Sequence, residues 1–471
     1  ETDAVGYIQD EWKVRPGLTL NLGFRYAFAS NPVEVHNKLF AFIPSSPTFV
    51  NVPRVFKSNP GLHNFDPRLG LAWAPFKDNR TSVRAGFGIF HDTYQVRSYG
   101  VGYNFLPPFN QPTVFFPAFT VPVVFQSTNP NTPTPVPAVH DALGYLICCT
   151  PYVIQYNLTV QHQLPGGVIA TVGYLGNQGN HLLAMQELNP PMNSGSPQNP
   201  QFAKLVNGVL ITNPRPNPNF GSMGEIQPSG HSSYNALQLS ANKAPSHGLQ
   251  GQANFTLSHC LDDSSGAYAI DTAAYVAPPS PFPLSRNRGN CGFNRNKVFT
   301  LNVVYSLPFH GNRFDRGWQF SGILTLDSGD PFTVFNEFDS AGLQGQNSAD
   351  LPNIAPGRTA ASIMKRNPNQ WFDPTAFTLP TPGTVGNEGR GQFFGPTLKQ
   401  FDVALIKGFT IEKYTLQLRF EAFNVFNHPN FADPNTGVFV DGAGDQDPTS
   451  GLITSTVTTS RQLQLSLKFI F

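Results

Sequence analysis

The chain has 471 residues, with 30 basic and 29 acidic side chains and a formal net charge of +1. This balance leaves no basic surface for phosphates and argues against a nucleic-acid partner. No apolar run approaches the roughly 18 residues of a membrane-spanning helix, and four cysteines are too few for a disulfide scaffold. The chain begins at Glu1 without a signal-like segment, and we take it as a mature product or a fragment.

Alternation of apolar and polar residues is the dominant pattern. From Leu18 to Phe28 every second residue is large and apolar, and the residues between them are polar or small. The same alternation runs from Leu463 to Phe469 near the C-terminus. A period of two residues predicts β-strands with one apolar face and one polar face.

In chain order, about 13 segments carry this pattern: 3–14, 17–29, 66–76, 80–91, 152–164, 167–176, 233–244, 248–259, 297–307, 317–328, 398–409, 412–424 and 460–471. Most of them are longer than an ordinary strand of about 5–6 residues. A strand tilted across a bilayer needs about 9–11 residues. The lengths therefore favour transmembrane strands.

The connections alternate between short and long. The short ones are Arg15–Gly17, Lys77–Asn79, Pro165–Gly166, Pro245–His247, Thr410–Ile411 and the looser turn 308–316. The long ones are about 30–65, 92–151, 177–232, 260–296, 329–397 and 425–459, and their Pro, Asn, Gly and Ser content predicts irregular coil. Short periplasmic turns and long external loops are typical of outer-membrane barrels. No linker divides the chain into separate domains.

These patterns predict an all-β fold, an antiparallel transmembrane β-barrel with the polar face toward a watery lumen and the apolar face toward lipid. If the short turns are periplasmic, the C-terminus is periplasmic and segment 3–14 runs inward. Single-chain barrels have an even number of strands that starts at the periplasm, so we expect the N-terminal part of the barrel to be missing. The pattern leaves open a large soluble β-sandwich or propeller, whose strands also alternate.

Stretches of recognisable character run along nearly the whole chain: YIQDEWKVRPGLTLNL (7–22), FDPRLGLAWAPF (65–76), SVRAGFGIFHD (82–92), PYVIQYNLTVQHQLPGG (151–167), VGYLGNQGNHL (172–182), SSYNALQLS (232–240), HGLQGQANFTLSHCLDD (247–263) and LRFEAFNVFNHPNF (418–431). Together and in this order they resemble the barrel of TonB-dependent receptors of the Oar-like group, which often carry a carboxypeptidase-regulatory-like domain.

The resemblance implies a barrel of about 22 strands filled by an N-terminal plug. Residues 1–471 would be the C-terminal part of that barrel, without plug, TonB box or regulatory-like domain. The implied function is energised uptake of a large nutrient (a saccharide, peptide or chelate) through the bacterial outer membrane. The implied partners are outer-membrane lipid, the TonB complex through the missing N-terminal segment, the outer-membrane assembly machinery and an unknown nutrient. A passive porin, a surface adhesin and a soluble β-rich binding module are the alternatives.

Two candidate features involve the end of the chain and the cysteines. Leu467, Phe469 and Phe471 resemble the C-terminal signal that the assembly machinery reads, although any lipid-facing strand end has a similar composition. Cys260 and Cys291 flank a long external loop, where a disulfide would restrict the loop. Free thiols, or a bridge involving Cys148 and Cys149, are equally compatible with the sequence.

The remaining candidates are charged. Arg25, Arg84 and Arg419 fall on polar strand faces and would point into the lumen, to contact the plug, steer anionic solutes or pair with carboxylates such as Glu421. The acidic run at Asp441, Asp445 and Asp447 has oxygen ligands suited to Ca²⁺ but lacks the EF-hand pattern, which favours a solvated loop. Nucleotide-binding, metalloprotease and hydrolase motifs are absent, so we expect no enzyme activity and no cofactor.

Overall fold

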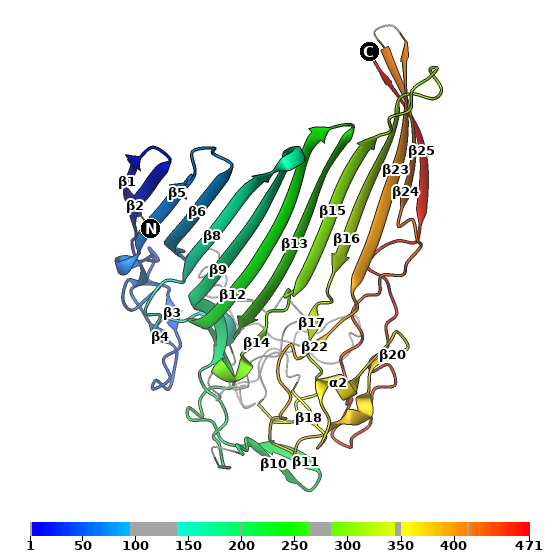
Figure 1. Cartoon of the computed structure of the whole chain (residues 1–471). Coiled ribbons are helices and arrows are strands. Elements are labelled where there is room, and N and C mark those ends of the chain that lie inside the picture. Colours follow the sequence, from blue (N-terminus) through cyan, green and yellow to red (C-terminus); the bar gives the residue numbers. More distant parts are fainter. Residues whose placement is uncertain are drawn as a thin grey trace.

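The computed structural model describes residues 2–94, 139–196, 199–263, 265, 284–343, 350–411 and 414–471. Its main element is one curved sheet, seen from the side in Figure 1. Thirteen strands follow one another across this sheet in chain order: β1 (Asp3–Arg15), β2 (Leu18–Ala29), β5 (Phe65–Trp73), β6 (Thr81–His91), β8 (Tyr152–Leu164), β9 (Val168–Glu187), β12 (Met223–Ser246), β13 (Leu249–Asp262), β15 (Lys297–Ser306), β16 (Trp318–Asp327), β23 (Leu398–Ile411), β24 (Tyr414–Phe423) and β25 (Gln462–Ile470). We call these thirteen strands the wall.

The thirteen strands confirm the thirteen segments expected from alternation, and 152–164 is matched residue for residue by β8. The largest difference is at β9 and β12, which extend well beyond 167–176 and 233–244. The two strands stay paired as far as Gly224 and Glu187, but register shifts near Pro228 and Gly230 interrupt the pairing. These bulges break the two-residue period, so alternation alone could not reveal the extension.

All neighbouring strands of the wall pair antiparallel. This confirms the expected antiparallel barrel sheet. A short strand outside the wall, β7 (Val139–Leu143), pairs parallel with β12. The pairing of β12 with β13 ends at Ser232. Beyond Ser232 one edge of β12 therefore needs a different partner, and β7 supplies it.

Tight turns join the strands at one end of the wall. Between β12 and β13, Ser246 pairs with Leu249 and the two residues between them, His247 and Gly248, both have positive φ (51° and 77°). This is the backbone of a type I′ hairpin turn, which suits the twist of paired strands. A Cβ on Gly248 would lie 2.6 Å from the carbonyl oxygen of Ser306, so the position also requires glycine for space.

Cross-strand register separates the two faces of the wall. On one face Asn21 lies opposite Gly70, Gly70 opposite Gly86, and Gly86 opposite Asn157. On the other face Leu158 lies opposite Tyr174, which lies opposite Leu237. One face is therefore polar or small across neighbouring strands, and the other is large and apolar, as the alternation predicts.

The long connections gather at the opposite end of the wall (Figure 1). The prediction of irregular coil there is wrong in part, because many described residues form short elements: β3 (Phe40–Ala41), β4 (Val50–Asn51), η1 (Pro60–His63), β10 (Ala203–Val206), β11 (Val209–Thr212), η3 (Leu284–Asn287), β14 (Gly289–Asn290), β17 (Pro331–Phe332), β18 (Asn353–Ile354), α2 (Ala360–Ile363), β19 (Met364–Asn367), β20 (Gln370–Phe372), η4 (Pro374–Ala376), β21 (Phe377–Thr378) and β22 (Phe393–Phe394). A further turn of 3₁₀ helix, η2 (Pro165–Gly167), lies between β8 and β9. Among the described residues, no helix combines the length and hydropathy needed to cross a bilayer.

Candidate functional site

The candidate site is the body formed by the long connections, which we call the loop lobe: the described residues of 30–64, 188–222, 328–397 and 424–461. Its largest hydrophobic core joins the connection between β16 and β23 to the one between β24 and β25. Phe332, Phe372 and Phe393 come from the first connection and Val438 from the second, and all four are buried. The rings of Phe332 and Phe393 lie with centroids 5.8 Å apart. Two connections distant in the sequence therefore fold as one unit.

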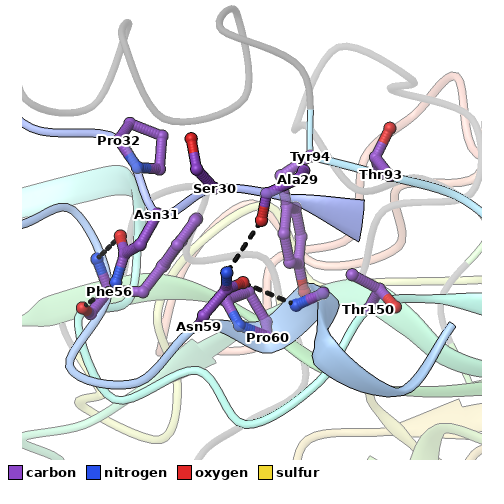
Figure 2. A pocket seen from close by; sticks show the side chains of 11 residues that line it. Ala29, Ser30, Asn31, Pro32, Phe56, Asn59, Pro60, Thr93, Tyr94 and Thr150 are labelled. Atoms are coloured by element: carbon purple, nitrogen blue, oxygen red, sulfur yellow. Dashed lines mark hydrogen bonds between the residues drawn. The ribbon is translucent and has the colours of Figure 1, made fainter. Parts of the chain in front are cut away.

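A second, smaller core lies under the connection between β2 and β5. Phe56 is buried there against Tyr94, with ring centroids 5.3 Å apart. Figure 2 shows this region, where Asn59 donates through Nδ2 to the carbonyl oxygen of Ala29 at 2.8 Å and Asn31 bonds the backbone of Phe56. The pocket that these residues line has only about 10 Å³, which holds at most one water. It is a packing feature and not a substrate pocket.

Polar side chains tie the connections to one another. Asn217 donates through Nδ2 to the carbonyl oxygens of Pro44 (3.1 Å) and Ser46 (2.6 Å). Arg215 donates to the carbonyl oxygens of Asn189 and Leu343, the latter at 2.9 Å. Three long connections are therefore held together by two side chains of the segment between β9 and β12.

A close backbone approach adds to this junction. The amide of Phe202 donates to the carbonyl oxygen of Gly383 at 2.7 Å, and the amide of Gly383 donates to that of Ser340 at 2.9 Å. Gly383 has a φ of 83°, and a Cβ there would overlap the backbone of Ala203. Glycine at this position allows the hairpin of β10 and β11 to lie directly on the connection between β16 and β23.

An ion-pair network holds the lobe to the wall. Arg390 is almost fully buried, forms an ion pair with Asp262 at the end of β13, and donates through Nε to the carbonyl oxygen of Asn287 at 2.8 Å. The next residue, Asp263, accepts from Arg288 at 3.2 Å and lies 3.2 Å from His231. Because both partners of the Arg390 pair are buried, losing either would leave an uncompensated charge.

Among the carboxyl groups of the lobe with raised pKa values, Asp350 and Glu388 are buried, whereas Asp433 is exposed and lies near Asp330. Partial desolvation, and then the nearby Asp330, raise the pKa of Asp433 to about 6, while Arg295 lowers it. Burial and the neighbouring Asp339 raise the pKa of Asp350 to about 7. Burial holds the pKa of Glu388 well above its ordinary value, although its carboxylate accepts a hydrogen bond from the amide of Val334 at 2.8 Å. The lobe therefore contains acids that are uncharged over part of the ordinary pH range.

Comparison with known proteins decides the family. A sequence model of the family described as outer membrane beta barrel domain matches residues 1–464. The chain belongs to this outer membrane β-barrel family. No curated protein matches the sequence.

One solved structure supports the barrel fold, and a second is similar at a lower score. The outer membrane transporter YddB from Escherichia coli superposes with a TM-score of 0.51 at 11% identity, over 99% of this chain and 44% of that protein. The siderophore receptor PirA from Acinetobacter baumannii gives a TM-score of 0.45 at 10% identity, over 99% of this chain and 45% of that protein. At such identity the likeness to YddB shows the fold alone. The chain spans less than half the length of either protein.

The outer membrane β-barrel family places the wall in the bacterial outer membrane. Its apolar face then meets lipid, which explains why large side chains such as Leu22, Leu158 and Leu237 remain exposed on the isolated chain.

On the polar face, Asn242, Gln252 and Asn302 lie side by side near the β12–β13 turn and line a groove of about 250 Å³.

The four charged residues expected on the polar face lie there by register. Arg25 is opposite Asp66, and Arg84 is opposite Thr159. Arg419 and Glu421 lie opposite Ser466 and Gln464, respectively. Arg419 donates to Gln417 Oε1 at 2.9 Å, rather than to Glu421. That these side chains line a water-filled lumen stays a prediction.

The cysteines and the chain end are placed as follows. Cys260 and Cys291 form a disulfide with Cα atoms 5.5 Å apart, beside the Asp262–Arg390 pair, and Cys148 forms a second disulfide with its neighbour Cys149. Leu467 and Phe469 lie on the exposed apolar face of β25, and Phe471 follows the strand with 94% of its surface exposed. The role of these three as an assembly signal stays a prediction.

The acidic run is not assembled into one site. Asp441 accepts from the amides of Ala443 and Asp445 and so caps its own turn. Asp447 turns away toward Asn435 and Thr449.

The sequence did not predict the hydrophobic core of the lobe or the buried Arg390, because these depend on contacts between distant segments. Aromatic pairs such as Trp371–Phe372, within segments predicted as coil, were the sequence feature that could have indicated this core.

Proposed function

We propose that the chain forms part of the barrel of a TonB-dependent outer-membrane receptor of the Oar-like group, which takes up a large nutrient such as a saccharide, a peptide or a chelate. The observation that carries the proposal is the wall: thirteen consecutive antiparallel strands, mostly of membrane-spanning length, with one polar face and a packed lobe at one end only. YddB, an outer membrane transporter, shares this fold over 99% of the chain.

The edges of the wall support a larger barrel. β1 and β25 are the outermost strands of the sheet, and each pairs on one side only within the described residues. Unpaired backbone groups are not stable in lipid, so these edges need further strands or each other. The chain covers only 44% of YddB, which leaves room for further strands and a plug in a complete receptor.

The lobe would be the external face in this function. Barrels of this class have short turns at the periplasm and long loops outside, which puts the loop lobe where substrate arrives. The polar face would line the passage, with Arg25, Arg84 and Arg419 along it. TonB would act from the periplasm through a segment that precedes the barrel strands.

The test uses the intact receptor, with its plug, in proteoliposomes. Swelling in L-arabinose measures leakage of a small solute, and calorimetry with the periplasmic domain of TonB measures the partner. We expect slow swelling and saturable TonB binding. Fast swelling with no TonB binding would instead establish a passive porin.

A second measurement separates the membrane classes from a soluble binding module. The chain is purified with and without detergent and examined by size-exclusion chromatography. We expect aggregation without detergent because the apolar face of the wall is uncovered. A stable monomer without detergent would contradict the proposal.

A further inference from the structure

A buried polar cluster lies in the connection between β16 and β23. Asn336 and Asp350 face each other in an isolated antiparallel bridge, and the amide of Asn336 donates to the carbonyl oxygen of Asp350 at 2.7 Å. Residues directly opposite in such a bridge project their side chains to the same side. Asn336 is 0% exposed and Asp350 is 6% exposed. The two side chains are therefore neighbours in a space shielded from solvent.

Two carboxyl groups meet in this space. Oδ2 of Asp350 accepts from the amide of Ala341 at 2.7 Å and from Ser340 Oγ at 3.1 Å. The carboxyl group of Asp339 lies within hydrogen-bonding reach of Asp350, and its Oδ1 accepts from the amide of Leu343 at 2.9 Å. Two carboxylates this close repel each other unless a positive charge or a proton lies between them.

The cluster also contains a buried amide oxygen without a hydrogen-bond donor. Oδ1 of Asn336 is buried and has no hydrogen-bond partner in the described structure. Nδ2 of the same amide donates to Ser340 Oγ at 3.2 Å, and that hydroxyl donates to Asp350. Asn336 is therefore joined to Asp350 through the Ser340 hydroxyl, and its buried amide oxygen lacks a donor, which is costly.

We propose that Asp339, Asp350 and the Oδ1 atom of Asn336 bind a divalent cation of the Ca²⁺ type. The donors are all oxygens, which Ca²⁺ prefers and binds in irregular geometry, whereas Zn²⁺ and Cu²⁺ sites favour nitrogen or sulfur. Such an ion would offset the negative charge of the two carboxyl groups and would also be coordinated by the amide oxygen of Asn336.

The positively charged side chain near the cluster does not neutralise both of its carboxyl groups. Arg215 is close enough to Asp339 to interact electrostatically and donates to the carbonyl oxygen of Leu343. The guanidinium of Arg215 also lies 3.8 Å from Glu187, so its one positive charge is shared and does not neutralise both carboxyl groups of the cluster. The described residues contain no group of three His, Cys, Asp or Glu suited to a metal. The site is thus a two-carboxylate site whose remaining ligands are water and neutral oxygens, which predicts modest affinity.

The position of the site gives the ion a structural effect. Ser340 accepts from the amide of Gly383, and Gly383 accepts from the amide of Phe202. The cluster is therefore linked to the hairpin of β10 (Ala203–Val206) and β11 (Val209–Thr212) through two backbone hydrogen bonds. A bound ion would rigidify the junction between the two connections. This inference does not depend on the proposed transport function.

The test is calorimetric titration of CaCl₂ into the EDTA-treated protein in detergent. We expect one site with a Kd on the order of 10⁻⁴–10⁻³ M, weakened at least tenfold by Asp350→Asn. This substitution keeps an oxygen for the amide of Ala341 and removes the repulsion, so folding should survive. No binding by the wild-type protein, or equal binding by Asp350→Asn, would overturn the site.

A matched control and a second readout complete the test. Asp441→Asn changes a carboxylate of the same lobe outside the cluster, and we expect it to leave Ca²⁺ binding unchanged. Loss of binding in Asp441→Asn but not in Asp350→Asn would assign the ion to the acidic run and refute the proposal. Limited proteolysis of 199–212 should slow in CaCl₂ relative to EDTA for the wild-type protein, and the difference should vanish in Asn336→Leu. Cleavage that is independent of Ca²⁺ in the wild-type protein would contradict the proposed rigidifying effect.

Discussion

The wall and the loop lobe are stabilised in opposite ways. Leu158 and Leu237 on the wall stay substantially exposed, whereas Phe372 and Val438 in the lobe are fully buried. The wall holds its strands through continuous backbone pairing and needs lipid to cover its apolar face. The lobe buries its own apolar side chains and holds charged groups such as Arg390 inside. A change in one region should therefore leave the stability of the other largely intact.

The largest expected effect concerns the end of the wall. Deleting Phe471 should lower the outer-membrane level of the protein several-fold, measured by quantitative immunoblotting of membrane fractions. Phe471 is 94% exposed and contacts little besides Phe469, so the loss would come from recognition during assembly and not from packing. Phe87→Ala, on the wall far from the terminus, is the control. Unchanged levels after the deletion would refute the signal role.

In the lobe, Phe372→Ala should destabilise the local fold by about 3–5 kcal/mol, because it removes a buried ring from a packed core. Limited proteolysis of intact cells should then cut the lobe faster, while the wall keeps its heat-modifiable migration in gels. Phe426→Ala, a change at a 76% exposed ring, should have little effect. Simultaneous unfolding of the wall would show that the two regions are not separable.

On the wall, Leu237→Arg should destabilise the inserted barrel by about 2–4 kcal/mol, because a charge on the lipid face is costly near the middle of the bilayer. The next residue, Gln238, lies on the polar face, and Gln238→Arg should be nearly neutral. Urea unfolding in lipid vesicles measures both. Equal costs at the two positions would mean that the faces are not distinguished by lipid.

The smallest effect is the pH dependence of the lobe. Because the folded lobe raises the pKa of Asp433 to about 6, it holds a proton that the unfolded chain releases near pH 4. This contribution is complete below pH 4, falls between about pH 4 and 6, and is absent above. Asp433→Asn should therefore flatten the thermal stability of the lobe across that range. An unchanged slope would show that Asp433 is not the group responsible.

The wall could be predicted from sequence because each strand carries its own signal. The alternation from Leu18 to Phe28 identifies β2 without knowledge of its partners. The prediction fell short where bulges near Pro228 shift the register. A disulfide between Cys260 and Cys291 was one of several pairings that the sequence allowed.

The lobe could not be predicted in the same way. The pair Asp262–Arg390 joins residues 128 positions apart, and no periodic pattern reports such a contact. Phe332 and Phe393 lie in Pro- and Gly-rich segments that favour coil. Their burial depends on packing between connections, which appears only once the wall has brought the connections together.

The most direct test of the central claim is a spin-label scan along β24. Labels at Leu416, Leu418 and Phe420 are compared with labels at Gln417, Arg419 and Glu421 in the protein inserted in lipid vesicles, with dissolved oxygen and a water-soluble nickel complex as relaxants. We predict strict alternation, with the first set accessible to oxygen from the lipid and the second set accessible to nickel. Equal access of nickel to both sets would contradict a wall that separates lipid from water.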